Sequence, residues 1–291
     1  MIDIKEHGII AKLFLPEANE PRPAVIILGG SGGGFDEPIA RLFARQGYVA
    51  LALAYFNADG LPKYLENIPL EYFLNAIRWL KNQLCVKSKQ VHLYGISRGG
   101  ELAILLASIF PEEITSVVAV VPSCVTYGGV PHVKKPAWTL NKKPLPIAPS
   151  PEVEDEREQQ RTYNSVNLTQ LFLEKMKKNA EKFETAMIKV ENIKCPLLIV
   201  SGKDDRMWPS WLYGEKIMQR LETTHSKIFR EHLCYENVGH VILPSSRAPV
   251  ITEAGKHPVT GLCYEVGGDP VAQAKANQDS WEKIIQFFTR F

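Results

Sequence analysis

The chain has 291 residues, 45% of them hydrophobic and 23% charged, which is the composition of an ordinary soluble globular protein. Its formal net charge of +2 is too small to indicate nucleic acid or an anionic membrane as a partner. No apolar run is long enough to span a membrane, and the mixed charges of the first residues are not typical of a signal peptide, so we expect a cytoplasmic protein. Five cysteines without a C-x-x-C pair favour reduced thiols over disulfides or a zinc site.

The first part of the chain alternates strand-like and helix-like segments. Strands are predicted at 8–15, 24–28 and 48–55, and the last two are wholly apolar, which suits strands buried on both faces of a parallel sheet. Apolar spacing predicts helices over 37–46 and 70–84. Such βαβ units build a mostly parallel sheet with helices on both faces, and ligands bind at the carboxyl ends of its strands.

The pentapeptide Gly95-Ile96-Ser97-Arg98-Gly99 lies between a β-prone run at 91–94 and a helix-prone run at 101–107. A serine hydroxyl is a poor nucleophile unless a base takes its proton and amide N–H groups meet the oxyanion that forms. A tight strand-to-helix turn presents the serine in a strained conformation, with no room for a Cβ two residues to either side. We therefore predict Ser97 as a nucleophile; the alternative is a glycine-rich turn with a spectator serine.

The strand at 24–28 ends in the glycine-rich loop 29–34. Backbone N–H groups in such a loop can point at an anion. A phosphate-binding loop is disfavoured because the closing Lys-Ser/Thr is missing and an acidic pair follows. Together with the serine turn, the loop predicts an oxyanion hole formed by the N–H of Arg98 and that of Ser31 or Gly32.

A strand is predicted at 114–121, and from about 123 to 193 the pattern lapses into proline-rich and charged stretches, with a helix near 168–187. An insertion over the strand ends of such a sheet is usually a lid, although a plain surface excursion is the alternative. We expect one domain over 1–291. The remaining predicted elements are strands at 196–200 and 228–235 and a closing amphipathic helix over 279–291.

The base and its orienting acid follow from chain order, which in such enzymes is Ser, then Asp or Glu, then His, each after a strand. Of seven histidines, His240 stands directly after the last predicted strand and is predicted as the general base. Asp204 and Asp205 both follow the strand at 196–200. The offset from Gly202 favours Asp205, with Asp204 as a solvated turn residue.

Several ordered motifs carry a family resemblance: YGISRGGELAILLAS, SGKDDRMWPS, ENVGH, the ending GGDPVAQAKANQDSWEKIIQFF, and the earlier GGSGGG and ALAYFNADGLPK. Together they resemble the catalytic domain of the acyl-CoA thioesterase and bile acid-CoA:amino acid N-acyltransferase family, a branch of the α/β-hydrolases. The resemblance implies an α/β-hydrolase fold, Ser97, Asp205 and His240 as a catalytic triad, and fatty acyl thioesters of coenzyme A as substrates. Larger members carry an N-terminal β-sandwich before this region, whereas this chain starts almost at the hydrolase.

The resemblance also bears on the reaction. In the amino-acid-transferring members the nucleophile is cysteine, so the serine at 97 favours hydrolysis by water. No metal, redox group or other cofactor is implied. Two alternatives stay open: a carboxylesterase or dienelactone-type hydrolase acting on small oxygen esters with the same triad, and a noncatalytic binding protein that keeps the fold. The following lysines are candidates to meet the phosphates of coenzyme A or form a solvated face: Lys134, Lys135, Lys142 and Lys143.

Overall fold

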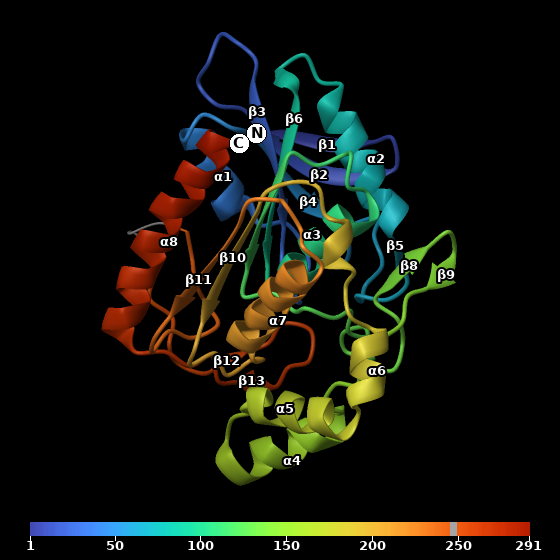
Figure 1. Ribbon diagram of the computed structural model, residues 1–291, viewed down its shortest axis with the longest axis vertical. Coiled ribbons are helices and arrows are strands. Elements are labelled where there is room, and N and C mark those ends of the chain that lie inside the picture. The colour runs from blue at the N-terminus through green and yellow to red at the C-terminus, as the bar shows by residue number, and fades with distance from the viewer. Residues whose placement is uncertain (245–248) are drawn as a thin grey trace.

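Eight strands form one mostly parallel sheet in the computed structural model, which describes residues 1–244 and 249–291 (Figure 1). Their order is β1-β2-β4-β3-β6-β7-β10-β11; the β1–β2 and β2–β4 pairs are antiparallel and all others are parallel. The strands are β1 Ile2–Glu6, β2 Ile9–Phe14, β3 Arg22–Leu28, β4 Val49–Ala54, β6 Val86–Ile96, β7 Ser116–Val120, β10 Leu197–Gly202 and β11 Arg230–Tyr235.

Helices cover both faces of this sheet, as expected for buried parallel strands (Figure 1). Successive side chains of a strand point to opposite faces: Ile26 belongs to one apolar core and Ile27 to the other. The first core includes residues of α2 Leu70–Lys81, α3 Arg98–Ile109 and α7 Ser210–Thr223. The second includes residues of α1 Glu37–Arg45 and α8 Pro270–Arg290.

The segment between β7 and β10 lies mostly beyond the carboxyl ends of the strands, where α4 and α5 form the lower end of the molecule in Figure 1. Its elements are β8 Trp138–Leu140, β9 Lys143–Pro144, α4 Val153–Tyr163, α5 Leu168–Lys178, α6 Ala180–Thr185 and the 3₁₀ turn Val190–Asn192. β8 pairs with both β9 and β5 Ile68–Pro69, and a separate short hairpin joins β12 Gly255–Lys256 to β13 Cys263–Tyr264.

The predicted fold class is confirmed, and several elements differ from the prediction in detail. Strand β1 was not expected. The predicted helix near 168–187 is two helices, because Asn179 leaves helical geometry with φ −134° and ψ 43°. The closing helix begins at Pro270 rather than 279, where Asp269 caps it by accepting from two backbone N–H groups. The charged stretch from 153 forms α4, although it lacks the apolar spacing of an amphipathic helix.

Candidate active site

Ser97 occupies a sharp turn between β6 and α3, with φ 56° and ψ −118°. A non-glycine residue in this region is strained and is held there by its surroundings. A Cβ on Gly95 would lie 2.0 Å from the carbonyl oxygen of Gly99, and a Cβ on Gly99 would lie 2.0 Å from that of Leu28. The expected reason for both glycines is therefore confirmed: the turn packs too closely against itself and β3 for any side chain.

Three side chains predicted from sequence form one hydrogen-bonded line at this turn. The Oγ of Ser97 lies 3.0 Å from Nε2 of His240, whose Nδ1 lies 2.9 Å from Oδ2 of Asp205. An ionised carboxylate can only accept, so Nδ1 carries the imidazole proton and Nε2 is free to accept the proton of Ser97. His240 is 8% exposed and Asp205 2%, so solvent scarcely reaches either.

The loop after β10 fixes the orientation of Asp205. The backbone N–H groups of Met207 and Trp208 donate to Oδ1 at 3.0 and 3.3 Å, and the hydroxyl of Ser210 donates to Oδ2 at 2.6 Å. Asp204 has a different task, because its carboxylate accepts from the N–H of Gly268 at 2.7 Å and from Arg206 at 3.1 Å. Of the two carboxylates left open by the sequence, the structure brings Asp205 to the imidazole.

The loop that carries His240 is held by the segment leading into α8. The N–H of His240 donates to the carbonyl of Val266 at 2.8 Å. The buried side chain of Gln273 forms hydrogen bonds to the loop on both sides of His240. The amide of Gln273 accepts from the N–H of Gly239 at 3.0 Å and donates to the carbonyl of Val241 at 2.9 Å. The GGDPVAQ motif therefore has a physical role, which is to position the imidazole.

The predicted oxyanion donors lie around Ser97. A Cβ on Gly30 would be 3.4 Å from Cβ of Ser97, so the glycine-rich loop passes directly beside the serine. Among the described residues, neither the N–H of Ser31 nor that of Gly32 takes part in a hydrogen bond. Arg98 is the first residue of α3, where an N–H has no partner within the helix. These amides are available to an anion at Ser97.

His257, which the sequence analysis did not single out, lies against the glycine-rich loop. Its Nε2 lies 2.8 Å from Oγ of Ser31, and its Nδ1 accepts from the N–H groups of Val259 and Thr260 at 3.2 and 3.3 Å. Burial lowers the pKa of His257, which favours the neutral ring. Since Nδ1 accepts, Nε2 carries the proton and donates to Ser31, so the imidazole anchors this loop. Because Ser31 and His257 are 226 positions apart, no local sequence pattern indicates this contact.

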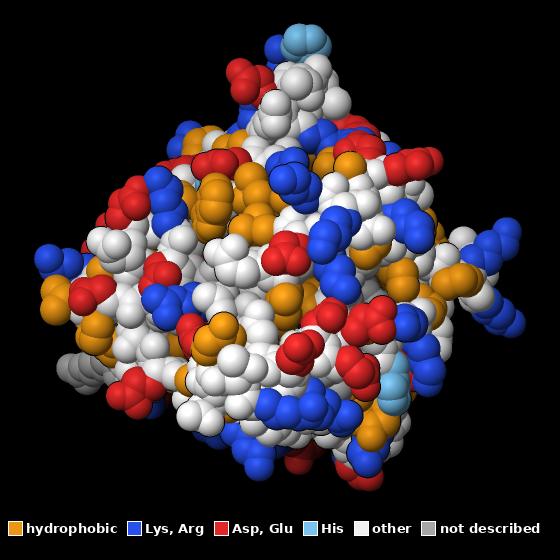
Figure 2. Space-filling model, turned by 90° about the horizontal axis from the view of Figure 1, so that it is seen from below, with side chains coloured by type: hydrophobic (Ala, Val, Ile, Leu, Met, Phe, Trp, Pro, Cys, Tyr) orange, Lys and Arg blue, Asp and Glu red, His pale blue; other side chains and the backbone are white. Residues whose placement is uncertain are grey.

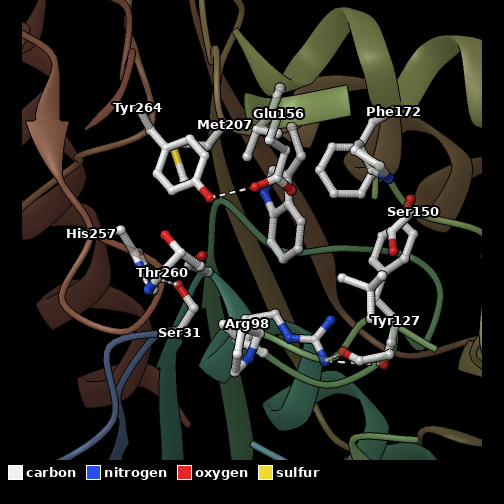
Figure 3. A pocket seen from close by; sticks show the side chains of 18 of the residues that line it. Ser31, Arg98, Tyr127, Ser150, Glu156, Phe172, Met207, His257, Thr260 and Tyr264 are labelled. Atoms are coloured by element: carbon white, nitrogen blue, oxygen red, sulfur yellow. Dashed lines mark hydrogen bonds between the residues drawn. The ribbon is translucent and has the colours of Figure 1, made fainter. Parts of the chain in front are cut away.

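The side chain of Arg98 points away from the reacting groups and forms a buried ion pair with Glu101 at 2.8 Å. The guanidinium also donates to the carbonyls of Tyr127 and Gly128 at 3.0 and 2.9 Å (Figure 3). Trp138 donates to the carboxylate of Glu101 at 2.8 Å. Burial raises the pKa of Glu101 to about 7, against the opposing effect of Arg98. The pair ties α3 to the insertion after β7.

A mostly apolar pocket opens over Ser97 and His240 (Figure 3). Helix α5 contributes Leu168 and Phe172 to its wall, and the loop after β10 contributes Met207 and Trp208. The other apolar lining residues are Val130, Pro131, Val133 and Pro151. Polar groups in the wall include Ser150, Glu156, Thr260 and Tyr264. Trp138 is not among the residues that line this pocket and belongs to the apolar core.

The four lysines noted in the sequence are exposed, and two of them form ion pairs. Lys134 pairs with Glu152 and Lys135 with Glu66, both at 2.8 Å. The face of the molecule that includes α4 and α5 shows acidic and basic side chains interspersed (Figure 2). Exposed pairs of this kind contribute little stability. These two lysines fit the solvated-face alternative.

Within residues 1–244 and 249–291, no helix combines the length and the apolar character needed to cross a membrane. Within the same residues, histidine, cysteine and carboxylate side chains nowhere gather in a group of three or more that could hold a metal ion.

The family model described as BAAT / Acyl-CoA thioester hydrolase C terminal matches residues 68–291. This chain belongs to that family. Curated relatives of this thioester hydrolase family agree: mouse (Mus musculus) acyl-coenzyme A thioesterase 2, mitochondrial, is 33% identical over 99% of this chain and 59% of its own length. Human (Homo sapiens) acyl-coenzyme A thioesterase 6 is 33% identical over 98% of this chain and 64% of its own length. The chain thus spans about three fifths of the relatives it matches, and the family resemblance of the motifs is confirmed.

Solved structures share the fold of this family member at low identity. A dienelactone hydrolase-like phosphotriesterase from metagenomic libraries matches with a TM-score of 0.57 and 17% identity, covering 99% of this chain and 96% of its own. A puromycin-hydrolyzing peptidase from Mycobacterium tuberculosis gives a TM-score of 0.60 and 13% identity, covering 97% of this chain and 37% of its own. At such identities the likeness concerns the α/β-hydrolase fold alone.

Proposed function

We propose that this protein hydrolyses acyl-CoA thioesters to a free acid and coenzyme A through an acyl-enzyme on Ser97. The observation that carries the proposal is the hydrogen-bonded line of Ser97, His240 and Asp205 at the floor of an apolar pocket. Family membership and relatives named acyl-coenzyme A thioesterases support the thioester as substrate.

Each group has a defined part in the reaction. The Oγ of Ser97 attacks the thioester carbonyl carbon while Nε2 of His240 takes its proton, and Asp205 stabilises the imidazolium. The N–H groups of Arg98 and of Ser31 or Gly32 donate to the oxyanion. The C–S bond then breaks, and the departing sulfur takes the proton from His240. Water attacks the acyl-enzyme with His240 again as base, and the acid leaves as Ser97 regains its proton.

The apolar wall supports the assignment of the pocket to the acyl group. The wall provides apolar surface against which an alkyl chain can be buried away from water, contributed by Leu168, Phe172 and Met207. A thiolate is a weaker base than an alkoxide and is therefore a better leaving group. Proton donation by His240 matters less for release of a thiol than it would for release of an alcohol. The triad alone does not separate a thioester from an oxygen ester. The carboxylesterase alternative is therefore an outcome of the test.

The test is thiol release from a panel of acyl-CoA esters, run beside nitrophenyl esters, with the wild type and Ser97→Ala. We expect turnover of the thioesters that falls by at least about a thousandfold in the variant. Cleavage of nitrophenyl esters without thioesters would overturn the substrate and favour the carboxylesterase alternative. A folded protein that cleaves neither would favour a noncatalytic binding protein.

The predicted cytoplasmic location stays a prediction, and one relative is mitochondrial by name.

A further inference from the structure

One acidic side chain interrupts the apolar wall of the pocket over Ser97. Glu156 of α4 is 7% exposed, yet it lines the same pocket as Ser97 and His240. Figure 3 shows its carboxyl group facing Tyr264 across this space. The reaction proposed above does not use it.

The hydrogen bonds of Glu156 are incomplete. Its Oε2 accepts from the hydroxyl of Tyr264 at 2.6 Å, and its Oε1 has no partner in the part of the chain that the structure describes. Its acidic neighbours in the sequence differ, because Glu152 pairs with Lys134 and Asp155 with Lys175. Within that same part of the chain, no cation pairs with Glu156. An acceptor thus remains open toward the pocket.

An alkyl chain alone is a poor match for this wall. Covering Oε1 with methylene groups would strip it of water and offer no donor in exchange, which is unfavourable for any buried polar group and more so for a charged one. A site with a buried acceptor discriminates strongly against a ligand that lacks the matching donor.

We propose that the pocket selects acyl groups that carry a hydroxyl, which donates to Oε1 of Glu156. This inference rests on the proposed function only in taking the acyl group as the occupant of the pocket. Glu156 would then be a specificity residue that touches substrate away from the reacting atoms, with Tyr264 as its positioning partner. The hydroxyls of Ser150 and Thr260 add to the polar part of the same wall.

The ionisation of Glu156 favours a hydroxyl over other donors. Burial raises its pKa to about 7; the bond from Tyr264 acts in the opposite direction, and Asp155 adds to the rise. Both forms of the carboxyl group are therefore populated near neutral pH. A hydroxyl can donate to the ionised form of Glu156 and accept from its protonated form. An ammonium group could bond only to the ionised form, and a carboxylate only to the protonated form.

The test compares CoA thioesters of equal chain length with and without a hydroxyl, using a series that moves the hydroxyl from carbon 3 to the terminal carbon. For the best-placed hydroxyl we expect kcat/KM to exceed that of the plain acyl group by about 10- to 100-fold. Glu156→Leu should remove this preference, because kcat/KM for the hydroxylated thioester should fall far more than kcat/KM for the plain one. Glu154→Leu is the matched control, because Glu154 lies exposed on the same helix.

Three results would overturn the inference. Equal losses on both long-chain substrates in Glu156→Leu, with acetyl-CoA cleaved as by the wild type, would mean that Glu156 merely anchors α4 to β13. Equal losses on every CoA thioester, acetyl-CoA included, would place the pantetheine arm in this pocket. Preference for an amino-acyl group that grows between pH 6 and 8 would replace the hydroxyl by an ammonium.

Failure of the proposed function is separable from failure of this inference. If thioesters are not cleaved, calorimetric binding of the free hydroxy acid and of the matched alkanoic acid measures the same preference without catalysis. Tighter binding of the hydroxy acid by wild type, lost in Glu156→Leu, would support the inference. Equal binding would refute it.

Discussion

The hydroxyl of Ser210 donates at 2.6 Å to Oδ2 of Asp205, the carboxylate oxygen nearest to Nδ1 of His240. It therefore helps to keep the carboxylate aimed at the imidazole. We expect Ser210→Ala to lower kcat about tenfold with little change in KM, since one bond to a charged group is lost. Steady-state kinetics measure this. Ser108→Ala is the control, because that buried hydroxyl donates to the carbonyl of Leu105 within α3; equal effects of both variants would contradict a role through Asp205.

The glycines of the serine turn predict a sharp contrast between neighbouring positions. Gly99→Ala should abolish thiol release and lower the free energy of unfolding by about 1–3 kcal/mol, because its Cβ would meet the carbonyl of Leu28. Gly29→Ala should be tolerated, since a Cβ there meets nothing within 4 Å. Urea unfolding measures both variants. A Gly99→Ala protein as stable and active as Gly29→Ala would contradict the close packing of the turn.

Removing the side chain of His257 should lower the reaction rate and leave the geometry of the triad unchanged. Both His257→Ala and Ser31→Ala should lower kcat about tenfold, because each removes the bond that fixes the glycine-rich loop. The double variant should lose little more than either single one, since the two residues share one interaction. His225→Ala, at an exposed position, serves as the control. Additive losses would show that the two side chains act separately.

Buried His92 predicts a stability that depends on pH. Burial lowers its pKa to about 4, and its Nδ1 lies 2.8 Å from Oγ of Ser116. In the unfolded chain this imidazole takes up a proton below about pH 6.5, whereas in the folded chain it stays neutral down to about pH 4. The contribution of His92 to the free energy of unfolding is therefore complete above pH 6.5 and falls as the pH drops toward 4. We expect it to make the protein about 2 kcal/mol less stable at pH 5 than at pH 7.

The measurement is urea unfolding at the two pH values for wild type and His92→Gln. The variant should lose this part of the pH dependence, even though its stability at pH 7 is lower. An unchanged difference between pH 5 and pH 7 would mean that other groups cause it.

Features close together in sequence could be predicted, because each depends on local chemistry. The wholly apolar runs became the central strands, and the glycines around Ser97 indicated a tight turn whose packing the structure explains. Chain order led to His240, and the spacing after β10 favoured Asp205 over Asp204.

Features that depend on distant contacts could not be predicted. Helix α4 has no apolar stripe and is held by its capping box at Glu152 and Asp155 and by the bond between Glu156 and Tyr264. The pairing of His257 with Ser31 joins residues 226 positions apart. Burial of Glu101 against Arg98 and Trp138 likewise depends on the insertion folding over α3.

Covalent blocking of Ser97 tests the central claim most directly. A fluorophosphonate reagent is added in increasing amounts, the labelled peptide is identified by mass spectrometry, and the rate of CoA release is measured on the same samples. We predict that the label lies on Ser97 and that thiol release falls in proportion to its occupancy, reaching zero at one label per chain. Full thiol release from protein whose Ser97 is completely labelled would contradict an acyl-enzyme on this residue.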